Sequence, residues 1–83
     1  MIRSYEARLN RLIKPSHELR AQIRRDKYDA VDDDDAVVAA KALHAYEYDP
    51  AIDQIIVFEL IPAGSIRLVT SIEGSLDGGL LDA

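Results

Sequence analysis

The stretch QIIVFELIPAGSIRLVTSI, residues 54–72, decides the fold class of this 83-residue chain. Two runs rich in β-branched residues, 54–61 and 66–72, flank the four residues PAGS, and this pattern predicts a β-hairpin. Apolar side chains occur on both faces of the first run. Because an isolated hairpin is only marginally stable in water, other parts of the chain must cover one face, and an uncovered edge is a candidate surface for association.

Three helices are expected upstream of the hairpin. Residues 2–13 place apolar side chains at spacings of three and four, and the lysine–proline pair at 14–15 ends this run, because the residue before proline disfavours helical geometry. Residues 16–27 form the second expected helix. Residues 33–47 are rich in alanine and apolar on nearly all sides, as in a helix that is buried on more than one side. We therefore predict an α+β fold with the order α-α-α-β-β.

The expected domain comprises residues 1–73, and residues 74–83, which contain three of the four glycines, are expected to form a flexible tail. The chain has no cysteine, so no disulfide can stabilise a domain of this size, and we expect a homodimer formed through the hairpin. No apolar run approaches the roughly 20 residues that span a bilayer. We therefore expect a cytoplasmic protein with no membrane partner.

Charge is distributed unevenly along the chain. Residues 1–28 carry eight basic and three acidic side chains, whereas residues 29–83 carry two basic and twelve acidic ones, and the net charge is −5. Such polarity bears on the partners of a protein and not on its fold. The sequence leaves open whether the two halves pair within one chain or between chains.

Four consecutive aspartates, Asp32 to Asp35, precede the alanine-rich segment. Calcium loops need ligands at alternating positions, a glycine and a distal glutamate, so this contiguous run argues against a metal site, and no metal or cofactor is expected. Asp32 or Asp33 is expected to cap the helix, and the helix dipole favours the others in its first turn. One cap suffices, so the excess negative charge suits a surface that meets a basic partner. The residues expected on this acidic partner-binding face are Asp32, Asp33, Asp34, Asp35, Glu47, Asp49 and Asp53.

These features favour a non-enzymatic protein-binding module. The chain has no nucleophile elbow, phosphate loop or dinucleotide-binding turn, and we expect that it is not an enzyme. The leading expectation is a small acidic inhibitor, of the antitoxin, immunity or anti-defence type, that blocks a basic nucleic-acid-handling protein.

Two alternatives remain open. On the second expected helix Arg20, Arg24 and Lys27 share one face, and two short basic helices have the outline of a helix-turn-helix. A small DNA-binding regulator would use these three side chains to contact phosphates. The other alternative is a structural subunit whose hairpin edge and tail dock into a larger assembly.

Overall fold

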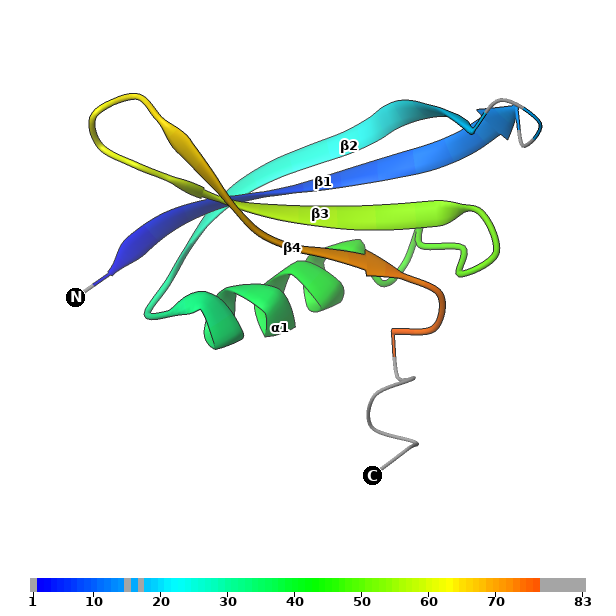
Figure 1. The fold of residues 1–83 in the computed structure, drawn as a ribbon. Coiled ribbons are helices and arrows are strands. Elements are labelled where there is room, and N and C mark those ends of the chain that lie inside the picture. The colour runs from blue at the N-terminus through cyan, green and yellow to red at the C-terminus, as the bar shows by residue number, and fades with distance from the viewer. Residues whose placement is uncertain (1, 15, 17, 77–83) are drawn as a thin grey trace.

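A four-stranded antiparallel sheet with one helix on one of its faces forms the protein (Figure 1). The computed structural model describes residues 2–14, 16 and 18–76. Its elements are β1 (Arg3–Lys14), β2 (Leu19–Ala30), α1 (Asp33–His44), β3 (Asp53–Leu60) and β4 (Ile66–Glu73). The strand order in the sheet is β2-β1-β3-β4, so β2 and β4 are its edges.

The predicted order α-α-α-β-β is wrong, because the observed order is β-β-α-β-β. Residues 2–13 and 16–27, expected to be helices, lie in the strands β1 and β2, which pair with each other. The structure is mostly strand with a single helix, so the predicted α+β class applies only loosely.

Side chains along β1 alternate between the two faces of the sheet, as they do in a strand and not in a helix. Tyr5, Ala7 and Leu9 are buried on the side of the sheet that faces α1, and the residues between them point to the other side. The same apolar positions also fit a helical spacing, so periodicity alone does not separate the two structures. β1 lies between its hairpin partner β2 and the distant β3, and hydrogen bonds to both strands override the local preference.

The predicted C-terminal hairpin is present. β3 and β4 pair antiparallel from Gln54 opposite Glu73 to Leu60 opposite Ile66, with an irregularity after Val57. The turn between them places Gly64 at a φ of 93°, a conformation that favours glycine.

Helix α1 begins as the sequence predicts, with Asp32 as its N-cap. The Asp32 carboxylate accepts a hydrogen bond of 2.8 Å from the backbone N–H of Asp35. The helix ends at His44, three residues earlier than expected. Only one stripe of it is buried, formed by Ala36, Ala40 and His44, so the expectation that several of its sides are buried is wrong.

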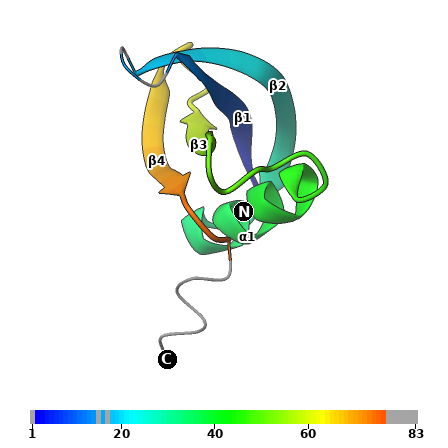
Figure 2. The same ribbon diagram turned by 90° about the vertical axis from the view of Figure 1, so that its right-hand side faces the viewer.

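The sheet curves over α1, which packs against β1, β2 and β3 (Figure 2). The core between them is small, and its buried apolar residues are Tyr5, Ala7, Leu9, Ala30, Ala36, Ala40, Ile55 and Val57. No described element covers the opposite face of the sheet in either view (Figures 1 and 2). Of the expected tail, Leu76 packs against the core, and residues 77–83 lie outside the described residues.

Candidate functional site

The seven acidic residues expected on one face lie in two groups, one at each end of α1. Asp32 to Asp35 surround its N-terminus, whereas Glu47, Asp49 and Asp53 follow its C-terminus. A helix of 12 residues is about 18 Å long. The structure therefore does not bring the two groups together into one patch.

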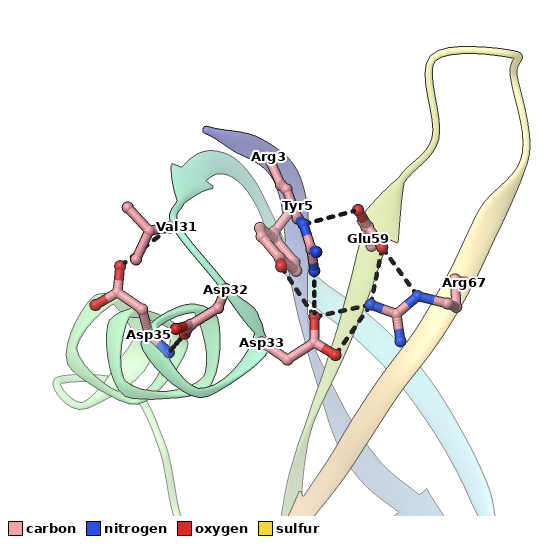
Figure 3. Close-up of polar contacts among 8 residues, drawn as sticks. All are labelled: Arg3, Tyr5, Val31, Asp32, Asp33, Asp35, Glu59 and Arg67. Atoms are coloured by element: carbon pink, nitrogen blue, oxygen red, sulfur yellow. Dashed lines mark hydrogen bonds and ion pairs between the residues drawn. The ribbon is translucent and has the colours of Figure 1, made fainter. Parts of the chain in front are cut away.

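Asp33 belongs to an ion-pair network that joins the start of α1 to the sheet (Figure 3). Its carboxylate accepts a hydrogen bond of 2.9 Å from the Tyr5 hydroxyl and two, of 2.7 and 3.0 Å, from the Arg67 guanidinium. Arg67 also donates to Glu59, and Arg3 lies within 4 Å of both carboxylates. The hydrogen bonds from Arg67 hold the pKa of Asp33 below its usual value.

The second acidic group is also paired within the chain. The Asp53 side chain is fully buried, and its two oxygens accept hydrogen bonds of 2.8 and 2.9 Å from Arg11. The backbone N–H of Asp49 donates to the same carboxylate. The hydrogen bonds from Arg11 are the main reason why the pKa of Asp53 is lowered. Glu47 accepts a hydrogen bond of 2.7 Å from Arg24.

The basic and acidic halves of the sequence thus pair within one chain, which answers the question that the sequence leaves open. Among the described aspartates of the acidic half, five form no ion pair with a described residue: Asp29, Asp32, Asp34, Asp35 and Asp49. Asp32 and Asp35 accept backbone hydrogen bonds. Because Asp32, Asp34 and Asp35 adjoin one another, uncompensated negative charge is concentrated at the first turn of α1.

An open cleft of about 530 Å³ lies between α1 and the edge strand β4. The residues that line it include Asp34, Val37 and Lys41 from the helix and Val69, Ile72 and Glu73 from the strand. One uncompensated aspartate, Asp34, thus lines a partly apolar cleft. The sequence does not reveal this cleft, because it depends on how the helix lies beneath the sheet.

The two edges of the sheet differ in their protection against further strand pairing. β2 carries six charged side chains among its twelve residues, whereas β4 carries only Arg67 and Glu73 among eight. Charged side chains on an edge strand discourage pairing with another chain. Ile66 and Leu68 on β4 are 53% and 59% exposed. β4 is therefore the unprotected edge.

The open face of the sheet carries a second cluster that the sequence analysis missed. Glu6 is only 3% exposed, and its carboxylate accepts a hydrogen bond of 2.6 Å from Arg8 and lies 3.8 Å from Arg25. The Arg8 guanidinium lies over the Phe58 ring at 4.5 Å from its centre, as in a cation–π contact. Lys27 lies opposite Glu6 in the strand pairing. Alternation of charged and apolar residues along β1 is the signal that could have indicated this face.

The helical face proposed for Arg20, Arg24 and Lys27 does not exist, because these residues lie in β2. Residues three apart in a regular strand point to opposite faces, so Arg24 and Lys27 are separated. Arg24 bonds to Glu47, whereas Arg20 donates to the backbone carbonyl of Ile52.

His44 is a buried side chain at the end of α1. Its ring is fully buried, and neither ring nitrogen forms a hydrogen bond with a described group. Burial lowers its pKa, against the opposing effect of Asp26, whose carboxylate lies 3.7 Å from Nε2. Within the described part of the chain, no three acidic, histidine or cysteine side chains gather into a group that could hold a metal ion.

Comparison of the chain with protein-family models, with curated proteins and with solved structures finds no match. Among the residues that the structure describes, no helix is long and apolar enough to cross a membrane.

Proposed function

We propose that the chain is a non-enzymatic protein-binding module whose partner presents a basic surface. The observation that carries this proposal is the group of aspartates at the first turn of α1, Asp32, Asp34 and Asp35, which no cation of the described chain neutralises. The narrower expectation of an inhibitor of the antitoxin, immunity or anti-defence type has no support among these findings and is not carried further.

Electrostatics favour a basic partner over a neutral one. The helix dipole stabilises acids in the first turn, but at an exposed site each acid gains only about 0.3–1 kcal/mol from it. Further aspartates repel one another, and a surface of opposite charge removes this repulsion while it also guides the encounter. The neighbouring Asp33 is already neutralised by Arg67, so it contributes little to such a surface.

Charge-matched variants test the proposal. Asp34→Asn with Asp35→Asn removes two uncompensated charges and keeps both the N-cap Asp32 and the Asp33 network. Asp29→Asn with Glu18→Gln removes the same charge elsewhere. Tagged chains are used to capture proteins from a nuclease-treated lysate of the source cells, and the affinity of the purified captured protein is measured at low and high salt.

We expect the unaltered chain to capture a basic protein. Its affinity should fall about ten-fold, and depend less on salt, for Asp34→Asn with Asp35→Asn, and it should stay unchanged for Asp29→Asn with Glu18→Gln. The proposal is overturned if no basic protein is captured, or if both double variants lose the same amount of affinity. Thermal melts of all three chains check that each variant folds.

A second candidate function is the binding of single-stranded nucleic acid on the open face of the sheet. It is favoured by the cluster of Arg8, Arg25 and Lys27 beside Phe58, because cations and flat stacking groups are what such ligands need. Fluorescence anisotropy with a labelled single-stranded oligonucleotide tests it. Salt-dependent binding that is lost on Arg25→Glu with Lys27→Glu supports this candidate, and absence of binding at low salt excludes it.

A further inference from the structure

We propose that the cleft between α1 and β4 binds an extended segment of the basic partner, which pairs with the free edge of β4 as a fifth strand. This inference rests on the proposed function and names the way in which the partner binds. The cleft and the unprotected edge adjoin each other, because residues of β4 form one wall of the cleft.

The backbone of β4 provides the main binding groups. β4 pairs with β3 on one side only. In an antiparallel ladder, successive residues direct their N–H and C=O groups alternately to the two sides of the strand, so about half of these groups on β4 face away from β3. An extended segment can bond to them in register, which is the mode known as strand addition.

The side chains around this edge suit both faces of an added strand. On the helix side, the segment meets Val37, Val69 and Ile72. On the open side, it lies beside Leu68, which is 59% exposed. Because side chains alternate between the two faces of a strand, the segment that fits best carries β-branched or other apolar residues on both faces.

Charge determines which segment fits. Asp34 lies at one end of the helical wall, next to the uncompensated Asp32 and Asp35, whereas Lys41 lies about two turns and 10 Å further along the helix. A segment with a lysine or arginine at the Asp34 end is therefore favoured. A second copy of β4 carries one arginine and one glutamate and therefore brings no net positive charge to the cleft, so charge complementarity favours the basic partner over self-association.

The two edge strands differ in charge, and β4 is the edge that can accept another strand. The opposite edge, β2, is charged at every second residue on average, as in strands that avoid further pairing. The middle of β4, residues 68–72, carries no charge at all. The chain thus protects one edge of its sheet and leaves the other open beside a cleft.

The test uses phage-displayed random eight-residue peptides selected on the full-length chain. We expect enrichment of extended sequences in which apolar residues are combined with lysine or arginine. Synthetic copies of an enriched peptide are then methylated on alternate backbone nitrogens, in two registers. Methylation removes the donors that strand addition needs, so one register is expected to bind about ten-fold more weakly than the other.

Matched variants of the chain locate the site. Thr70→Lys places a charge on β4 in the wall of the cleft, and Ile23→Lys makes the same kind of change on β2, where Ile23 is 37% exposed. We expect Thr70→Lys to weaken peptide binding about ten-fold and Ile23→Lys to leave it unchanged. For the unaltered chain, slower hydrogen exchange of β4 amides on addition of peptide is a second readout that needs no variant.

The outcomes separate this inference from the proposed function. If no peptide is enriched, or if neither methylation nor Thr70→Lys weakens binding, strand addition at β4 is refuted. If the captured basic protein still depends on Asp34 and Asp35 but binds Thr70→Lys normally, the proposed function stands and only this inference fails. If ultracentrifugation shows a dimer that Thr70→Lys dissociates, a second copy occupies the edge and the inference is likewise overturned.

Discussion

Replacing Asp53 by asparagine tests whether this carboxylate serves the fold or a docking surface. The change keeps the shape of the side chain, so it creates no cavity. Both carboxylate oxygens accept hydrogen bonds, from Arg11 and from the backbone N–H of Asp49. Whichever oxygen becomes the amide nitrogen, it faces a donor, and at least one buried hydrogen bond is lost together with the charge of the pair.

The size of the expected loss of stability follows from these contacts. A hydrogen bond to a charged group contributes about 1.5–3 kcal/mol, and removal of one partner of a buried ion pair costs about 3–5 kcal/mol. Because Arg11 is partly exposed and stays hydrated, we expect a decrease of about 2–4 kcal/mol in the free energy of unfolding. For a domain of this size, this corresponds to a fall in Tm of about 10 °C or more. Urea unfolding followed by circular dichroism measures it.

The pH dependence of the free energy of unfolding provides a second test, and its direction can be predicted. The pKa of Asp53 is lower in the folded chain than its ordinary value of 3.8, mainly through Arg11. Its contribution is therefore complete above about pH 4 and is lost as the pH falls through the folded pKa. The difference between the original chain and Asp53→Asn should shrink in acid.

Asp34→Asn is the control for this experiment, because the same chemical change at an exposed, unpaired carboxylate should alter stability by less than about 0.5 kcal/mol. The reasoning is refuted if Asp53→Asn lowers the free energy of unfolding as little as Asp34→Asn does, or if the difference between the original chain and Asp53→Asn does not change with pH. Asp53 would then be a candidate for the acidic docking surface again.

Two further predictions concern the side chains that hold α1 on the sheet. Burial lowers the pKa of His44 below its ordinary 6.5, so stability should be complete above about pH 6.5 and fall as the pH drops below it; urea unfolding at several pH values should show a smaller fall for His44→Leu. Arg67 links Asp33 to Glu59, so Arg67→Leu should speed hydrogen exchange of the Ala36 amide, which bonds to the Asp32 carbonyl at the start of α1, while the amides of β1 stay protected; exchange of Ala36 at an unchanged rate would show that the network is dispensable.

Local patterns predicted the parts of the fold that local contacts specify. The hairpin of β3 and β4 follows from two β-branched runs around a short turn, and the start of α1 follows from the Asp32 cap. The spacing of Tyr5 and Leu9 fits a helix and a strand equally well, and the alternation of apolar and charged residues around Ala7 extends over too few residues to decide between them. Charged residues filled the other positions of β1, so its central place in the sheet could not be seen.

The candidate site was predicted only in part. The charge excess of Asp32 to Asp35 is visible in the sequence, but the sequence does not show that Asp33 is neutralised by Arg67, 34 residues away. Nor does it show that Asp53 is buried against Arg11. Ion pairs between distant residues depend on strand register, and a register emerges only when the whole sheet forms.

The sequence by itself determined the C-terminal hairpin, the capped helix and the excess of aspartates, because each depends on neighbours within a few residues. Tertiary structure alone decided that the N-terminal third forms strands, because β1 gains its hydrogen bonds from β2 and from the distant β3. It also decided which acids remain uncompensated and which edge of the sheet stays open. Both depend on the position of α1 beneath the sheet, and long-range packing sets that position.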